Sequence, residues 1–193
     1  MTVSELPNAD LQFYPEAFTQ PEATAYFDSL LEFIAWEQRQ ISFFGQLVNQ
    51  PRLVAWYGDP DAVYTYSNTT FEPLPWIAPL IEIKRRVETV ADVTFNSVLC
   101  NLYRDGSDSM GFHSDDEPEL RAVPVIASVS FGATRTLRFH HKKRSDLKYS
   151  LELTHGSLLV MQGTTQQFWK HGIPKTSKPV GPRINLTFRV VRK

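Results

Sequence analysis

After Asp92 the chain is a succession of short strand-like runs with no helix-length segment between them. The runs are rich in β-branched and aromatic residues and are separated by turn residues, which is typical of β-strands. They are Phe95 to Tyr103, Val123 to Phe131, Thr136 to His140, Tyr149 to Leu153, Ser157 to Gln162 and Ile184 to Val191. Because parallel strands need long crossover connections, this pattern predicts an antiparallel sandwich or jelly roll.

Two stretches before Asp92 carry apolar residues at helical spacing. The first runs from Pro21 to Gln40 with Thr19 as its expected N-cap, and the second runs from about Trp76 to Val90. We therefore expect an α+β chain that forms one domain over residues 1–193. In it, a helical and loop portion (residues 1 to about 92) packs on a β-rich core (about 93 to 193).

The composition is that of an ordinary globular protein. Of its 193 residues, 42% are hydrophobic and 21% are charged, and the formal net charge is −1. This balance argues against a histone-like binder but allows a local basic surface. Cys100 is the single cysteine, and neither a signal-peptide pattern at Met1 to Asp10 nor an apolar run of roughly 18 residues is present. We expect an intracellular protein, cytoplasmic or nuclear, that is neither secreted nor embedded in a membrane.

A histidine stands beside a carboxylate cluster in the segment His113 to Glu117. If this segment is extended, the side chains of His113 and Asp115 lie on one face about 6.6 Å apart, close enough to converge on a metal ion. His171 follows another strand-like run and could supply a third ligand from a neighbouring strand. Two histidines and one carboxylate form the facial triad of Fe(II) oxygenases. A surface hydrogen-bonding pair and a zinc hydrolase site remain open alternatives at this point.

The last strand-like run alternates polar and apolar residues. The polar set is Arg183, Asn185, Thr187 and Arg189, and the apolar set is Ile184, Leu186, Phe188 and Val190. Arg183 and Arg189 would lie about 20 Å apart along a strand, and their long side chains could lean inward around a short dicarboxylate. Arginine suits bidentate capture of a carboxylate. The alternative is an edge strand with a solvated polar face.

Several motifs stand in a fixed order along the chain. They are Asn96 to Tyr103, His113 to Glu117, Ser128 to Arg135, His171 and Arg183 to Arg189, extended upstream by Pro51 to Asp59 and Tyr64 to Ser67. Together they resemble the AlkB family of nucleic-acid dealkylating dioxygenases over roughly Phe43 to Val191. The resemblance implies a double-stranded β-helix, or jelly roll, with N-terminal helices and a nucleotide-recognition lid.

The resemblance also implies a metal site. His113, Asp115 and His171 would be the catalytic ligands of Fe(II). The cofactors of the family are Fe(II), 2-oxoglutarate as cosubstrate and O2. The iron performs the difficult oxidation while the protein holds the alkyl carbon beside it.

A cosubstrate site is implied on the polar strand face and its neighbour. Arg183 would pair with the distal carboxylate of 2-oxoglutarate, assisted by Tyr103 and Asn185. Arg189 and Asn101 would hold the end that chelates the iron. Guanidiniums suit carboxylates, and the phenol and amides supply orienting hydrogen bonds.

The family must meet its target base single-stranded or flipped out of the stack. By resemblance, Tyr66 would stack on that base opposite the ring of His113, while Tyr64 and Glu117 would hydrogen-bond its polar edge. Without the resemblance, Tyr64 and Tyr66 fit a hairpin with one aromatic packed inside, and Glu117 fits a solvated surface.

Two further features bear on nucleic acid. Phe44 stands where some duplex-repairing relatives carry an apolar wedge, although core packing is the alternative for a phenylalanine. The run from His140 to Arg144 joins two predicted strands as a basic hairpin. Its Lys142, Lys143 and Arg144 would contact phosphates, whereas a solvated turn is the alternative.

These observations predict an enzyme that oxidatively removes alkyl groups from bases of the N1-methyladenine and N3-methylcytosine type. The expected partner is alkylated DNA, with RNA as an additional substrate, and we expect a monomer. One alternative keeps the oxygenase but places its substrate on a protein or small molecule. The other is a binding module that recognises damaged nucleic acid without repairing it. The sequence does not distinguish single-stranded from double-stranded substrates.

Overall fold

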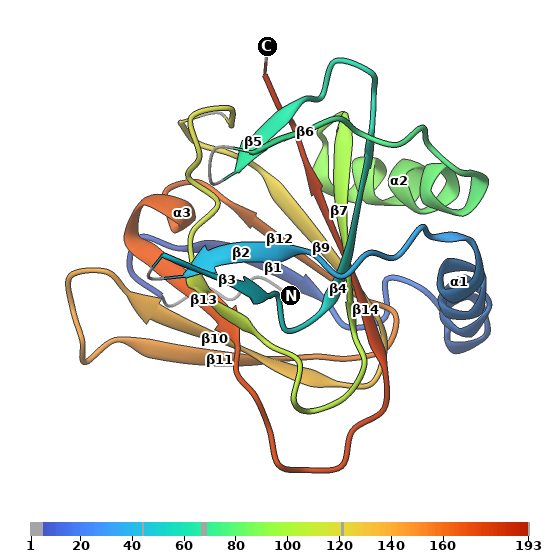
Figure 1. The fold of residues 1–193 in the computed structure, drawn as a ribbon. Helices are drawn as coiled ribbons and strands as arrows, with labels where there is room; N and C mark the ends of the chain where they lie inside the picture. Colours follow the sequence, from blue (N-terminus) through green and yellow to red (C-terminus); the bar gives the residue numbers. More distant parts are fainter. Residues whose placement is uncertain (1–5, 44, 67–68, 121, 193) are drawn as a thin grey trace.

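Two antiparallel sheets face each other in the computed structural model, which describes residues 6–43, 45–66, 69–120 and 122–192 (Figure 1). The major sheet has, in spatial order, β1 (Asp10–Tyr14), β12 (Ser157–Gln162), β9 (Ile126–Gly132), β14 (Arg183–Arg189), β7 (Ser97–Tyr103) and β4 (Leu53–Gly58). The minor sheet has β11 (Lys148–Leu153), β10 (Arg135–His141), β13 (Trp169–Ile173) and β8 (Met110–His113). The predicted antiparallel sandwich is confirmed.

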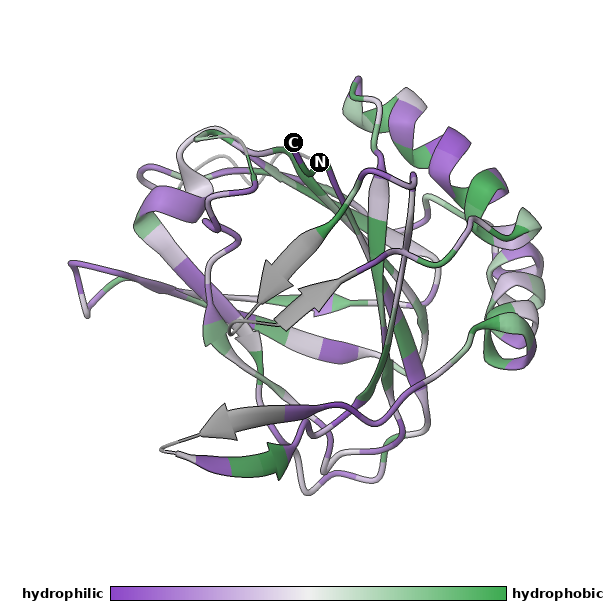
Figure 2. Ribbon diagram, turned by 45° about the horizontal axis from the view of Figure 1, so that its top comes forward, coloured by the Kyte–Doolittle hydropathy of each residue, from purple (hydrophilic) through white to green (hydrophobic). Residues whose placement is uncertain are grey.

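The two helices cover the outer face of the major sheet. Helix α1 (Gln20–Phe33) and helix α2 (Ala78–Ala91) bury Leu30, Ile83 and other apolar side chains in one cluster with the sheet. Figure 2 shows hydrophobic and hydrophilic bands alternating along α2, as expected of a helix with one buried face. Within the described ranges, no helix combines the length and the apolar composition that crossing a bilayer requires.

The central strand β14 separates two different environments. Its Ile184, Leu186 and Phe188 belong to the apolar cluster under the helices. The opposite face of β14 therefore points at the minor sheet, because successive side chains alternate across a strand. A second apolar cluster between the sheets includes Leu159 of the major sheet and Phe139 of the minor sheet. The polar residues of β14 lie in this inner layer.

The first predicted helix is correct at its start and wrong at its end. Thr19 is the N-cap, and its backbone N–H donates to the Glu22 carboxylate at 2.9 Å. The helix ends at Phe33, not at Gln40, because Ile34 is extended and Glu37 pairs with Val54 of β4. Tertiary pairing thus outweighs the local helical spacing of the residues beyond Phe33. The second helix prediction is confirmed.

Each strand run predicted after Asp92 is present, Ser157–Gln162 with its predicted ends and the others with shifted ends, but β8 and β13 were missed. Both strands are short and contain glycine (Gly111 and Gly172), which weakens a strand pattern. The first 92 residues also supply more than helices and loops, since β1 and β4 form the two edges of the major sheet.

Two hairpins complete the described structure. They are β2 (Gln40–Phe43) with β3 (Gln46–Asn49), and β5 (Tyr64–Tyr66) with β6 (Thr69–Phe71). A short helix, α3 (Thr165–Phe168), connects β12 to β13. This connection leads directly into the strand that carries His171.

Candidate metal centre and the adjoining groove

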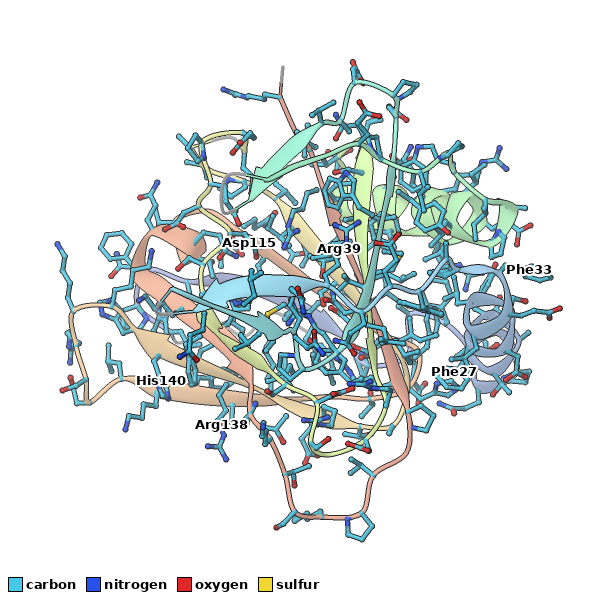
Figure 3. All side chains as sticks on the ribbon, viewed as in Figure 1. Phe27, Phe33, Arg39, Asp115, Arg138 and His140 are labelled. Carbon is cyan, nitrogen blue, oxygen red and sulfur yellow. The ribbon has the colours of Figure 1, made fainter. Side chains whose placement is uncertain are left out.

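The structure brings His113, Asp115 and His171 together between the two sheets. His171 on β13 is the register partner of His113 at the end of β8, and Asp115 follows two residues later in the bend after β8. One potential ligand atom from each residue lies within 4.8 Å of the others. The Oδ2 atom of Asp115 lies 3.4 Å from Nε2 of His171, inside the molecule (Figure 3). The arrangement can hold one metal ion.

Gly172 lets β8 come close to β13. A Cβ atom at this position would lie 2.9 Å from the Met110 carbonyl oxygen and 3.1 Å from the Gly111 backbone. The strand register also shifts between His171 and Ile173. Glycine is therefore required here for the approach that sets His113 beside His171.

Asp115 is held as a buried carboxylate with one oxygen turned to the site. Burial raises its pKa, but the charge of Arg189, with smaller contributions from His171 and His113, outweighs this and lowers the pKa to about 2. Arg189 Nη2 donates to Oδ1, and the Asp115 N–H donates to Gln166 Oε1 at 2.9 Å. Among the described residues, Oδ2 accepts no hydrogen bond. A charged, buried oxygen without a donor suits a cation.

The two histidines differ in their surroundings. Burial, together with the charge of His113, lowers the pKa of His171 to about 3, so its ring is uncharged at neutral pH. His113 Nδ1 lies 3.0 Å from the Gly111 carbonyl oxygen. Since a carbonyl only accepts, Nδ1 carries a hydrogen and donates it to Gly111, which leaves Nε2 as the ring nitrogen that could bind a metal.

The polar face of β14 lines the interior cavity next to these three residues. Arg183, Asn185, Thr187 and Arg189 all border it, together with Asn101 and Tyr103 from the neighbouring β7. Strand β14 lies between β9 and β7 and is buried along its whole length. The alternative of an edge strand with a solvated face is therefore wrong.

Arg183 is the cation at the far end of this face. Its side chain is 1% exposed, Nη2 donates to Ser130 Oγ at 2.9 Å, and the guanidinium lies 5.1 Å from the ring centre of Tyr103. Burial lowers its pKa to about 10, which still leaves it charged at neutral pH. Within the described part of the chain, Nε and Nη1 have no hydrogen-bond partner. A buried cation with two donors that have no described partner suits an anion.

Asn185 and Asn101 are register partners and are both held by neighbours. Asn185 Nδ2 donates to Ser128 Oγ at 2.8 Å and to the Val129 carbonyl at 3.0 Å. Asn101 Oδ1 accepts a hydrogen bond from Arg52 Nε at 2.8 Å. These contacts fix the orientation of both amides at the cavity wall.

Several residues of the site were not assigned from the sequence. Arg52, Gln166, Ser128, Ser130 and Arg135 each hold a group at the cavity or next to it. The alternation of Ser128 and Ser130 with apolar residues in a predicted strand was a usable signal. The contacts of Arg52 and Gln166 depend on segments far apart in the sequence, and no local pattern indicates them.

A larger open groove adjoins the cavity. Leu99, Met110, His113 and Arg189 line both, so the groove leads to the candidate metal centre. Its wall also includes Glu117. The groove offers access for a substrate from solvent.

The predicted basic hairpin is the turn between β10 and β11, and only part of it faces the groove. Lys142 lines the groove, where Nζ lies 2.9 Å from Asp116 Oδ2 and donates to the Gln166 carbonyl at 2.8 Å. Lys143 is exposed, and Arg144 pairs with the exposed Asp146 at 3.0 Å. The three residues therefore have different surroundings.

Two more of the predicted substrate residues, Tyr64 and Tyr66, lie on the hairpin of β5 and β6. The structure describes the backbone of Tyr64 and Tyr66 in β5, paired with Phe71 and Thr69 of β6. The hairpin considered for this segment is therefore present. Phe44 lies outside the described residues.

Comparisons with known proteins agree with this geometry. Residues 10–189 match the family model of the 2OG-Fe(II) oxygenase superfamily. Over 187 residues the chain is 45% identical to mouse alpha-ketoglutarate-dependent dioxygenase alkB homolog 3, covering 92% of this chain and 65% of the mouse protein. Over 188 residues it is 41% identical to human DNA oxidative demethylase ALKBH2, covering 92% of this chain and 72% of the human protein. The chain belongs to the AlkB family.

The AlkB-family chain spans slightly less than two thirds of the mouse relative, since the match covers 65% of that protein. The solved structure of OsALKBH1 resembles the fold with a TM-score of 0.68 at 15% identity, covering 93% of this chain and 97% of the other. This likeness confirms the jelly-roll fold expected from the motifs.

Proposed function

We propose that this chain is an Fe(II)- and 2-oxoglutarate-dependent dioxygenase that removes alkyl groups from damaged DNA bases. The observation that carries the proposal is the buried convergence of His113, Asp115 and His171, with ligand atoms within 4.8 Å, beside the arginine-bearing face of β14. The names of the mouse and human relatives, a dioxygenase and a DNA oxidative demethylase, support it.

The metal would be held by His113, Asp115 and His171. Two imidazoles and one carboxylate match the ligand set of non-haem Fe(II) oxygenases. The Oδ2 atom of Asp115, which accepts no hydrogen bond from the described residues, fits this role. Arg189 holds the other oxygen of that carboxylate and thereby fixes its orientation.

The cosubstrate would lie along the polar face of β14. Arg183 carries a buried positive charge and two donors without a described partner, which suits the distal carboxylate of 2-oxoglutarate. Tyr103 and Asn185 border the same cavity and would orient that end. Arg189, which contacts Asp115, would hold the chelating end together with Asn101.

When bound, iron, 2-oxoglutarate and O2 supply the oxidation that releases the alkyl carbon as formaldehyde, with succinate and CO2 as the other products. The chain's own part is to bind, orient and exclude water. Apolar Leu137, Leu153 and Ile173 line the cavity among its polar groups and leave little room for solvent. Asp115 stays charged and His171 stays neutral at neutral pH, so neither needs to exchange a proton to bind the metal.

The groove would receive the damaged base. Alkylation at a ring nitrogen of adenine or cytosine leaves a positive charge, and the Glu117 carboxylate on the groove wall complements it. Tyr66 would stack on the base opposite the ring of His113, and Tyr64 would assist Glu117 at the polar edge. Lys142, Lys143 and Arg144 would contact phosphates, and Phe44 would fill the vacated stack.

The same proposal includes the finer expectations about partners and location. Alkylated DNA is the substrate, RNA is also accepted, and the protein acts as a monomer inside the cell. Residues 1–193 form a single AlkB-like dioxygenase domain in this proposal. The oxygenase acting on a protein or small molecule and the non-catalytic binding module are the competing functions.

A repair assay separates these functions. The protein is loaded with Fe(II) without oxygen and then exposed to air with 2-oxoglutarate and a single-stranded oligonucleotide carrying one N3-methylcytosine. Base mass, formaldehyde and succinate are measured. His113→Ala tests the ligand set, and His155→Ala is the matched control, because His155 lies between α1 and β9, away from the cavity.

We expect repair by the wild type and by His155→Ala, and none by His113→Ala. Succinate without loss of the methyl group would contradict the nucleic-acid substrate and favour a protein or small molecule. Absence of both products in the wild type would favour the binding module.

A further inference from the structure

The outer face of the minor sheet carries a group of cationic and aromatic side chains that the active site does not use. We name it the outer-sheet patch, and its members are Lys148 on β11, Arg138 and His140 on β10, Lys170 on β13 and Phe112 on β8. Their neighbours along the strands, such as Phe139 and Trp169, are buried between the sheets. Alternation therefore directs the patch residues away from the metal centre. Figure 3 shows Arg138 and His140 at the periphery of the molecule.

The strand register makes the patch continuous. His140 is paired with Lys148 on one side and with Lys170 on the other, so three basic residues form a row across three strands. Arg138 stands two residues from His140, in the next row, about 6.6 Å along the strand. Glu152 is an acidic residue exposed on β11, at the far end from Lys148. The part of the patch that holds Arg138, Lys148 and Lys170 is therefore positively charged.

The cations of the patch differ from those of the basic hairpin. Lys142 and Arg144 each form a salt bridge with an aspartate. Arg138, Lys148 and Lys170 are exposed and form no salt bridge with any residue in the described ranges. Unneutralised cations on one face are what an anionic chain such as a sugar-phosphate backbone requires.

An aromatic platform lies within the same patch. The rings of Phe112 and His140 stack with centroids 4.1 Å apart and planes 18° apart, and Phe112 is 42% exposed. Strand β13 lies between their strands, and its Gly172 places no side chain between the two rings. An exposed flat platform beside cations is the arrangement on which unpaired bases stack.

The patch is also continuous with the groove. Phe112 and Lys170 belong to the patch and line the groove that leads to His113. A strand whose damaged base enters the groove therefore has its flanking nucleotides next to the patch. Because a base must expose its face to stack on Phe112, the strand must be single there.

We propose that the outer-sheet patch binds the single-stranded segment that flanks the target nucleotide. Phe112, supported by His140, stacks one unpaired base, and Arg138, Lys148 and Lys170 contact phosphates. This inference rests on the proposed function, because it extends the same substrate beyond the groove.

Charge reversal tests the phosphate contacts. Arg138→Glu and Lys148→Glu lie in the patch, and Arg85→Glu on α2 is the matched control, since Arg85 is exposed and α2 lies on another side of the molecule (Figure 1). The probe is an unmodified, fluorescently labelled single strand of about 15 nucleotides. Its binding is measured by fluorescence anisotropy at several salt concentrations. Each lost phosphate contact should reduce the slope of log affinity against log salt by about 0.7.

We expect Arg138→Glu and Lys148→Glu to weaken binding about tenfold each and to lower the salt slope, while Arg85→Glu changes neither. Equal effects in all three variants would mean that binding depends on net charge and not on the patch, and would overturn the proposal. No effect in the patch variants would overturn it as well. Circular dichroism checks that every variant is folded.

Two further measurements complete the test. A 5-iodouracil placed at successive positions beside the target should cross-link to Phe112 or His140 at one flanking position, and cross-links elsewhere only would contradict the stacking. The ratio of repair of a methylated single strand of about 15 nucleotides to repair of a methylated trinucleotide should fall in the patch variants. If the wild type repairs neither, the proposed function fails; if it repairs both and the ratio is unchanged, only the patch fails.

Discussion

The interior cavity buries its charged side chains, whereas the adjoining groove leaves its charged side chains partly exposed. In the cavity, Asp115, Arg183 and Arg189 are nearly inaccessible to solvent, and each is held by a group from another segment of the chain. On the groove side, Lys142 and Asp116 form a partly exposed pair at the surface. The cavity is built on central strands, and the groove is lined partly by turns and segments before β4. The fold therefore fixes the charged groups of the cavity more firmly than those of the groove.

This difference has an energetic basis. Removing one partner of a buried ion pair costs about 3–5 kcal/mol, whereas an exposed pair contributes about 0–1 kcal/mol. Substitutions in the cavity should therefore act strongly on metal or cosubstrate. Substitutions of groove residues that do not also line the cavity should act weakly and on nucleic acid alone.

The largest effect is expected for Asp115→Asn. The change removes the charge that faces the metal site and leaves Arg189 without its anion, so iron affinity should fall by about 100-fold or more. Asp116→Asn is the matched control, because Asp116 is the adjacent aspartate but is exposed and faces the groove. Iron binding is measured by anaerobic titration. Similar affinities for the two variants would contradict the different roles of these aspartates.

Arg183→Lys should act on the cosubstrate. Lysine keeps the charge but cannot form the bidentate contact, so the KM for 2-oxoglutarate should rise by about 10- to 100-fold. The nucleic-acid KM should stay unchanged, because Arg183 lines the cavity and not the groove. Succinate formation is measured at varied 2-oxoglutarate concentration. An unchanged cosubstrate KM would remove Arg183 from the site.

Lys142→Gln should act on the nucleic acid and not on the cosubstrate. Loss of one partly exposed cation should raise the KM for the oligonucleotide by a factor of about 2 to 5. Lys143→Gln is the neighbouring control outside the groove. Repair is measured at varied oligonucleotide concentration. A change in the 2-oxoglutarate KM would show that cavity and groove are not separate.

The smallest effect is expected on stability, when a fall in pH protonates His155. This residue lies away from both the cavity and the groove. Its Nδ1 accepts from the Gly132 N–H at 2.8 Å, its Nε2 faces Thr24 Oγ1 at 3.2 Å, and burial lowers its pKa from 6.5. The folded state disfavours the protonated ring, so the stability that depends on the neutral ring is present above pH 6.5 and is lost as the pH falls below it. Urea unfolding of wild type and His155→Gln across this range should show a steeper loss in the wild type. Parallel curves would contradict the role of His155.

The sequence predicted more of the interior cavity than of the groove and the outer-sheet patch. The alternation along β14 indicated its two faces, but its central position depends on pairing with β9 and β7, which a single strand does not encode. The spacing of His113 and Asp115 indicated a metal site, although β8 and β13 were missed because they are short and contain glycine. The contact of Arg52 with Asn101 joins distant segments and has no local signal. The patch on the outer sheet depends on register across four strands, so composition alone could not indicate it.

The central claim is that the interior cavity binds Fe(II) and 2-oxoglutarate through Asp115 and Arg183, independently of the groove. The most direct measurement is an anaerobic titration of the iron-loaded protein with 2-oxoglutarate, followed by the visible charge-transfer absorption of the chelate. We expect the band in the wild type and in Lys142→Gln, a need for more 2-oxoglutarate in Arg183→Lys, and no band in Asp115→Asn. A band in Asp115→Asn as strong as in the wild type, or its absence from the wild type, would contradict the account.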